Sequence, residues 1–160
     1  MHEVALDAQH LKQPDILQRV LQLAGQCEGI QAVRSIIYTV LSELFNNALE
    51  HGILKLDSKL KADSTGFHQY YENREASLKA LSHGRINIRI ESLPLKGKVL
   101  IAVEDSGEGF EWNKASTVGR RHSVHDESFG RGLPLLHALC ERVWFENGGS
   151  KVICLLDTKI

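Results

Sequence analysis

The chain has 160 residues, of which 42% are hydrophobic and 24% charged, and its formal net charge is −1. This length predicts one domain around a single core, and the charge argues against broad attraction to nucleic acid. Since no apolar run reaches the roughly 20 residues that span a bilayer, and the start Met1-His2-Glu3-Val4 does not resemble a signal peptide, we expect a cytoplasmic protein without membrane or nucleic-acid partners.

The first part of the chain has mainly helical periodicity. A short strand is predicted at Val4–Leu6, and Pro14 suits the first turn of a helix that ends near Gly25 or Gly29. A second helix is predicted from about Ile30 to Glu50, because its apolar residues follow the 3.6-residue period. Gly52 is typical of a helix end.

Residues 53–83 are polar and have helical tendency. We expect one or two surface helices here, with a disordered start near residues 57–64. The aromatic and leucine side chains have the spacing of an apolar stripe: Phe67, Tyr70, Tyr71, Leu78 and Leu81.

The remainder of the chain predicts strands joined by short turns. The expected strands are Arg85–Glu91, Val99–Val103, Val143–Glu146 and Lys151–Leu156, with a loop over 107–128 and a helix from Pro134 to about Glu141. Strands connected in this way form an antiparallel sheet. We therefore predict an α+β fold, a two-layer sandwich whose mostly antiparallel sheet is covered on one face by helices.

Cysteine and histidine spacing predicts no metal site. Cys27, Cys140 and Cys154 lie in apolar segments without a CxxC pair, so we expect buried thiols. The eight histidines form no HxH or HExxH pattern.

Three polar or glycine-rich motifs carry the candidate chemistry. The first lies on the second helix, where Glu43, Asn47 and Glu50 are expected to share one face at spacings i, i+4 and i+7. A carboxylate and an amide oxygen one turn apart can hold a hard cation. The alternative is a solvated helix face, although two mid-helix asparagines, Asn46 and Asn47, cost helix stability without helping the fold.

The second motif, Asp105-Ser106-Gly107-Glu108-Gly109-Phe110, follows an apolar strand. Its two glycines allow close approach of the backbone to a ligand, and Asp105 could accept a hydrogen bond from an amino group. The alternative is an ordinary hairpin turn.

The third motif, Gly130-Arg131-Gly132-Leu133, precedes a helix. A Gly-x-Gly turn at a helix N-terminus presents free N–H groups to an anion, and Arg131 could contact phosphate. The chain contains neither a Walker loop nor a Rossmann glycine fingerprint.

In chain order, these motifs resemble the N box and two glycine boxes of the Bergerat-fold ATPase/kinase superfamily, which includes gyrase, Hsp90 chaperones, sensor histidine kinases and anti-sigma-factor kinases. Gly149-Ser150-Lys151-Val152 is similar to the family's closing strand, whose hydroxyl lies near the adenine. The resemblance covers residues 3–157 and implies one ATP- and Mg²⁺-binding domain over residues 1–160.

The resemblance also implies a role for each candidate residue. Glu43 would be the general base, Asn47 the Mg²⁺ ligand, and Asp105 the acceptor for the adenine amino group. The remaining nucleotide-contacting residues would be Asn46, Gly107, Gly109, Phe110, Gly130, Arg131, Gly132, Leu133 and Ser150.

The continuation Asn47-Ala48-Leu49-Glu50-His51-Gly52 is most similar to the bacterial anti-sigma-factor serine kinases. These phosphorylate a STAS-domain antagonist and can hold a sigma factor, and many form homodimers, so the resemblance implies the same activity and partners here. Residues 53–84 depart from the compact kinases as a helical insertion. They resemble the kinase domain of response regulators with a PP2C-type phosphatase, which implies that the chain is part of a longer protein.

Two other functions stay open at this point. One is a nucleotide-binding interaction module that sequesters a sigma factor or antagonist with little catalysis. The other is a histidine kinase catalytic domain, disfavoured because no helical histidine-bearing segment precedes the motifs and the segment from Phe110 to Phe129 is a short lid.

Overall fold

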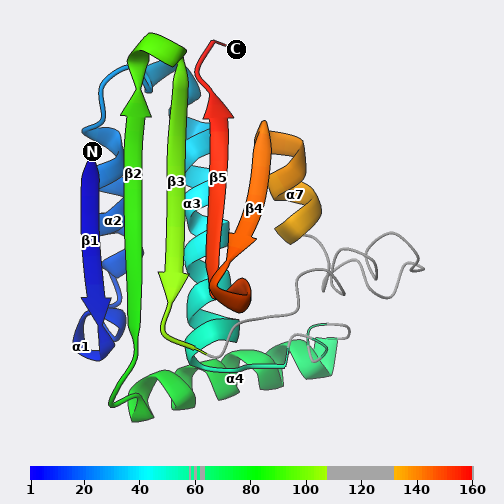
Figure 1. Cartoon of the computed structure of the whole chain (residues 1–160). Coiled ribbons are helices and arrows are strands. Elements are labelled where there is room, and N and C mark those ends of the chain that lie inside the picture. Colours follow the sequence, from blue (N-terminus) through cyan, green and yellow to red (C-terminus); the bar gives the residue numbers. More distant parts are fainter. Residues whose placement is uncertain (58, 60, 62–63, 108–131, 160) are drawn as a thin grey trace.

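The computed structural model describes residues 1–57, 59, 61, 64–107 and 132–159 (Figure 1). Five antiparallel strands form one sheet in the order β1-β2-β3-β5-β4. Their bounds are β1 His2–Asp7, β2 Arg85–Leu93, β3 Lys98–Asp105, β4 Arg142–Glu146 and β5 Lys151–Asp157. The predicted strands and their antiparallel pairing are confirmed.

Within the described part of the chain, the helices cover one face of this sheet and leave the other open (Figure 1). They are α1 Ala8–Leu11, α2 Ile16–Gly25, α3 Arg34–Asn47, α4 Ser64–Ala80 and α7 Gly132–Leu139, with short 3₁₀ turns at Gln31–Val33, Pro94–Lys96 and Asn147–Gly149. The predicted two-layer α+β sandwich is therefore confirmed. Helix α4 differs from α2 and α3, because it crosses below one end of the sheet.

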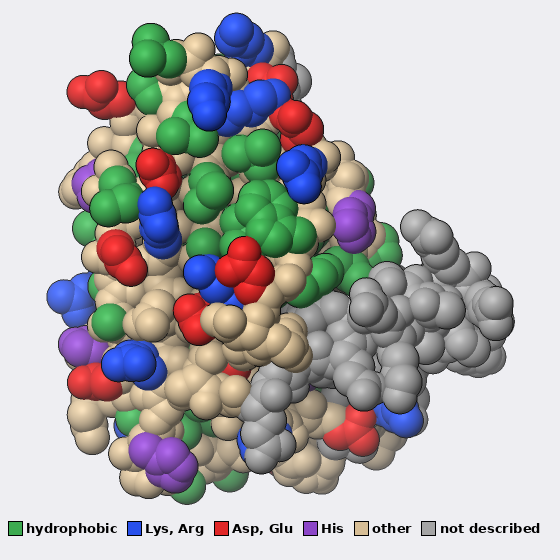
Figure 2. All heavy atoms as spheres, in the orientation of Figure 1, with side chains coloured by type: hydrophobic (Ala, Val, Ile, Leu, Met, Phe, Trp, Pro, Cys, Tyr) green, Lys and Arg blue, Asp and Glu red, His purple; other side chains and the backbone are tan. Residues whose placement is uncertain are grey.

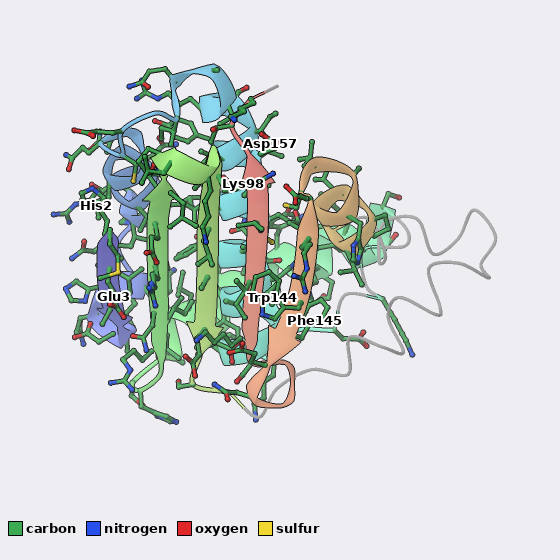
Figure 3. The ribbon with its side chains drawn as sticks, turned by 45° about the horizontal axis from the view of Figure 1, so that its top comes forward. His2, Glu3, Lys98, Trp144, Phe145 and Asp157 are labelled. Carbon is green, nitrogen blue, oxygen red and sulfur yellow. The ribbon has the colours of Figure 1, made fainter. Side chains whose placement is uncertain are left out.

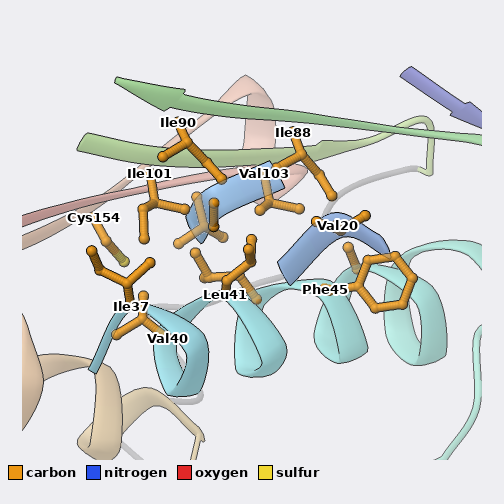
Figure 4. Close-up of a cluster of buried hydrophobic side chains, with 14 of the residues drawn as sticks. Val20, Ile37, Val40, Leu41, Phe45, Ile88, Ile90, Ile101, Val103 and Cys154 are labelled. Atoms are coloured by element: carbon orange, nitrogen blue, oxygen red, sulfur yellow. The ribbon is translucent and has the colours of Figure 1, made fainter. Parts of the chain in front are cut away.

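The core lies between α2, α3 and the covered face of the sheet (Figure 4). Every second residue of β2 and β3 points into it, as strand alternation requires. The side chains that meet there are Val20, Ile37, Val40, Leu41, Phe45, Ile88, Ile90, Ile101, Val103 and Cys154, all buried. The three cysteines are buried free thiols, as predicted.

The open face of the sheet mixes charged and apolar side chains (Figure 2). A shallow groove of about 260 Å³ lies over the central strands, with Ala102 and Ile153 in its lining and Trp144 on β4 beside them. Lys98 pairs with Asp157 at 3.0 Å (Figure 3) and also with Glu141. Helix α4 lies at the other end of β3 (Figure 1). Among the described residues, no helix has the length and apolar character needed to cross a membrane.

The predicted stripe on α4 is confirmed only in part. Tyr70 is buried, and Leu78 and Leu81 pack against the core. Phe67 and Tyr71 are instead 46% and 49% exposed. Their rings contact each other edge to face, with centroids 4.8 Å apart.

Candidate functional site

The first candidate site residues meet at the end of α3. The amide nitrogen of Asn47 lies 3.3 Å from Oε1 of Glu43, one helical turn earlier, and both residues are half-buried. The N-terminus of α7 approaches the same two side chains, since a Cβ at Gly132 would lie 2.0 Å from Glu43 Oε1 and 3.3 Å from Asn47 Nδ2. The fold thus joins the first and third motifs. We call Glu43, Asn47 and Gly132 the Glu43 cluster.

A second group forms where β3 ends. The Gly107 N–H donates to Asp105 Oδ1 at 2.8 Å, and the Asp105 N–H donates to the Ser150 carbonyl of β5's leading turn at 2.9 Å. A Cβ at Gly52 would lie 2.4 Å from the Asp105 carboxyl carbon, and one at Gly107 would lie 2.2 Å from the Gly52 carbonyl oxygen. A side chain at Gly107 would therefore clash with backbone, and one at Gly52 would displace the Asp105 carboxylate. We call Gly52, Asp105 and Gly107 the Asp105 cluster.

The environment of Asp105 disfavours its charged form. Burial raises the pKa of this carboxyl, the neighbouring Glu104 charge adds to the rise, and the Gly107 N–H partly opposes it. With Oδ1 bonded to Gly107, Oδ2 can accept a hydrogen bond from an amino group. A carboxylate kept in a partly dry site at a cost to stability is typical of a ligand-binding position.

The helix that carries Glu43 and Asn47 changes from α-helical to π-helical winding at Ala48. The prediction of one α-helix to Glu50 is wrong, because α3 ends at Asn47 and residues Ala48–Ile53 form a π-helical segment. Its wider turn shows in the i+5 bond from Leu54 N–H to the Leu49 carbonyl at 2.8 Å, and a bond from Leu56 N–H to the Glu50 carbonyl, also 2.8 Å, closes the chain just after it. Local π-helical winding occurs often at functional sites.

The predicted position of Glu50 is also wrong. Its carboxylate does not join Glu43 and Asn47 on one polar face; it is buried and bonded to Tyr70 of α4. The i+7 spacing predicted a shared face only because a regular α-helix was assumed.

Gly52 is the site residue that the sequence did not reveal. The sequence predicted a helix end at this residue, yet Gly52 lies inside the π-helical segment. It packs so closely against Asp105, 53 positions later in the chain, that a Cβ there would overlap the Asp105 carboxylate. Its sequence signals were a position close after a polar helical motif and a place at the end of the Asn47–Gly52 continuation, and neither indicated a contact with Asp105.

The other predicted residues have different surroundings. Asn46 is half-buried on α3, and Leu133 is buried at the start of α7. The Ser150 hydroxyl donates to the Asn147 carbonyl at 2.9 Å and so closes the turn before β5. Gly109, Phe110, Gly130 and Arg131, together with the predicted loop and lid, lie outside the described residues.

A groove of about 560 Å³ adjoins the Asp105 cluster. It runs between Gly52–Lys55, the C-terminal end of α4, and the turn at Ser106 and Gly107. The site therefore combines a helix with a carboxylate and an amide, a helix N-terminus, and a recessed carboxylate flanked by glycines.

The two clusters bring residues of all three sequence motifs to the C-terminal end of α3 and the segment that follows it. Residues 32–160, most of the chain, match the family model described as histidine kinase-, DNA gyrase B-, and HSP90-like ATPase. The chain belongs to this family. No curated protein sequence matches it.

The described residues fit a nucleotide with a magnesium ion. The glycines around Asp105 leave the backbone bare at the carboxylate that would receive an adenine amino group. Asn47 keeps its amide oxygen for a hard cation while its nitrogen faces Glu43. The described residues contain no cluster of three or more His, Cys, Asp or Glu side chains for a metal.

Proposed function

We propose that the chain is an ATP- and Mg²⁺-dependent protein serine kinase of the anti-sigma-factor type, which phosphorylates a STAS-domain anti-sigma-factor antagonist in partner switching. The main support is the Glu43 cluster, where a carboxylate lies beside the predicted Mg²⁺ ligand Asn47 and against the N-terminus of α7. A domain that only binds nucleotide has no use for a carboxylate at this point.

The proposed reaction depends on positioning rather than on covalent catalysis. ATP would supply the transferable phosphoryl group, and Mg²⁺ would neutralise the phosphate charge. Asn47 would hold the metal, and the free N–H groups at the start of α7 would face the phosphates. Asp105 would fix the base at the other end of the site.

Glu43 would act on the protein substrate. Its carboxylate is the group in the Glu43 cluster that can accept a proton, so it would take the proton of the serine hydroxyl as the oxygen attacks.

The test is a transfer assay with the purified chain, radiolabelled ATP, Mg²⁺ and the STAS proteins of the source organism. We expect label on a serine of one cognate STAS protein. Glu43→Gln should lower the transfer rate by about 10²- to 10⁴-fold while ATP affinity stays within about twofold, because the substitution removes the base and keeps the shape. Glu28→Gln, at an exposed position before the 3₁₀ turn that leads into α3, is the matched control.

Two outcomes would contradict the kinase proposal. Wild-type protein that binds ATP but labels no STAS protein is not a serine kinase of this type. If it then captures a STAS protein or a sigma factor equally well with and without Glu43→Gln, it is a nucleotide-binding interaction module.

A further inference from the structure

Helix α4 is fastened to the helix of the site through one buried carboxylate. The Tyr70 hydroxyl donates to Glu50 Oε1, and Lys61 Nζ lies 3.4 Å from the same oxygen. Arg74, one turn after Tyr70, lies 3.5 Å from Glu50 Oε2. Both carboxylate oxygens are thus occupied by groups from α4 or from the segment just before it.

The Tyr70–Glu50 contact is buried and highly directional. Tyr70 is 0% exposed and Glu50 9% exposed. Burial and the adjacent Glu50 carboxylate raise the pKa of Tyr70, so its hydroxyl stays protonated and donates at all physiological pH values. The Lys61 ammonium lies 4.4 Å from the centre of the Tyr70 ring, which adds a cation–π contact on one side.

Glu50 belongs to the same π-helical segment as Gly52. The carboxylate is held by α4, and the Glu50 carbonyl accepts the Leu56 N–H at 2.8 Å, so this residue is anchored through both side chain and backbone. Two residues later, Gly52 lies against the Asp105 carboxylate, and its carbonyl lies against Gly107. A shift of Glu50 would therefore be passed to the Asp105 cluster.

Helix α4 also borders the groove beside that cluster. Ser77, Ala80 and Leu81 line it together with Gly52 and Gly107. The helix thus meets the base end of the site at two places, the buried carboxylate and the groove wall. Neither place involves the Glu43 cluster.

We propose that Glu50 and Tyr70 are positioning residues for base recognition, through which α4 sets how tightly and how selectively the Asp105 cluster binds adenine. This proposal rests on the proposed nucleotide binding. It assigns residues 53–84 a function within the site, and it implies that a change in the position of α4 alters ATP affinity.

The test compares Tyr70→Phe with Tyr71→Phe. Tyr70→Phe removes only the buried hydroxyl that donates a hydrogen bond to Glu50. Tyr71→Phe removes a hydroxyl from the neighbouring, exposed ring on the same helix. ATP and ITP affinities are measured by displacement of a fluorescent ATP analogue, since ITP lacks the amino group that Asp105 would bind. Tyr70→Phe should weaken ATP binding by about tenfold and ITP binding by less than about twofold, and Tyr71→Phe should change neither.

A purely structural role predicts a different result. A general loss of folding would weaken both nucleotides by the same factor, and that result, or unchanged ATP affinity in folded Tyr70→Phe protein, overturns the proposal. If Tyr70→Phe does not fold, Arg74→Gln, which keeps the tyrosine, is the second variant. It should also weaken ATP binding more than ITP binding, by a smaller factor than Tyr70→Phe.

Hydrogen–deuterium exchange separates this proposal from the nucleotide-binding proposal. Without any nucleotide, Tyr70→Phe should speed amide exchange in the π-helical segment Ala48–Ile53 and at Gly107, and leave α2 unchanged. Wild-type protein that binds neither ATP nor its analogue would contradict ATP binding alone. Unchanged exchange in Tyr70→Phe would contradict the coupling between α4 and the site.

Discussion

At the Asp105 cluster, backbone packs against backbone, whereas at the Glu43 cluster a helix N-terminus packs against the tips of two side chains. A Cβ on Gly107 would meet the Gly52 carbonyl oxygen, which is fixed by the π-helical segment. A Cβ on Gly132 would meet only Glu43 Oε1 and, further away, Asn47 Nδ2.

The difference separates a rigid end of the site from an adaptable one. The sheet holds Asp105 through the bond of its N–H to Ser150, and α4 holds the segment around Gly52. The Glu43 carboxylate can rotate about its own side chain to accommodate phosphates and a serine. Under the proposed function, recognition of the base would be preorganised in this arrangement, and the reacting end would adjust to its two substrates.

The largest effect is expected from Gly52→Ala. The new methyl group would overlap the Asp105 carboxylate, which would have to leave the position where it accepts the Gly107 N–H and faces the site. We expect ATP affinity to fall about 100-fold and the free energy of unfolding to fall by about 1–3 kcal/mol, measured by calorimetry and urea denaturation.

Gly29→Ala is the control for this substitution. Gly29 has a φ of +76° and open space around it, so alanine there should cost about 1–2 kcal/mol in stability and nothing in ATP affinity. Gly52→Ala protein that binds ATP like the wild type would show that the Asp105 cluster is not the rigid end.

Gly132→Ala should have a smaller effect, mainly on the transfer rate rather than on stability or ATP affinity. The methyl group displaces the Glu43 carboxylate, which can swing aside, so the melting temperature should hardly change. The transfer rate should fall by about tenfold because the base is moved, with a smaller loss of ATP affinity. Steady-state kinetics on the STAS substrate separates the two values, and an equal loss in both would contradict the proposed division of the site.

The smallest expected effect is a gain in stability from Asp105→Asn. Because burial raises the pKa of Asp105 in the folded state, folding loses stability as the pH rises through the ordinary aspartate pKa and the raised folded value. Asparagine does not ionise, so the variant should melt a few degrees above wild type at pH 7 and at the same temperature at pH values below that window.

The same substitution should weaken ATP binding, because an amide cannot replace the carboxylate as a charged acceptor at both oxygens. Exposed Asp15, whose side chain makes no capping bond to α2, provides the control Asp15→Asn, for which we expect no change in either measurement. A melting temperature that falls for Asp105→Asn at pH 7 would show that the charge stabilises the fold.

The sequence by itself determined the features that depend on local geometry. Strand alternation and short turns predicted the antiparallel sheet and its covered face. The i, i+4 spacing predicted that Glu43 and Asn47 would meet, because an α-helix fixes that contact within one turn. The position of Asp105 at a strand end followed from the apolar run before it.

Only the tertiary structure decided the contacts between residues far apart in the chain. Gly52 is needed where it is because Asp105 arrives from another element, and Glu50 turns away from Asn47 because Tyr70 of α4 binds it. Both contacts fall on the short π-helical segment Ala48–Ile53. The periodicity of the sequence could not predict these contacts, because each depends on a residue that only the completed fold brings close.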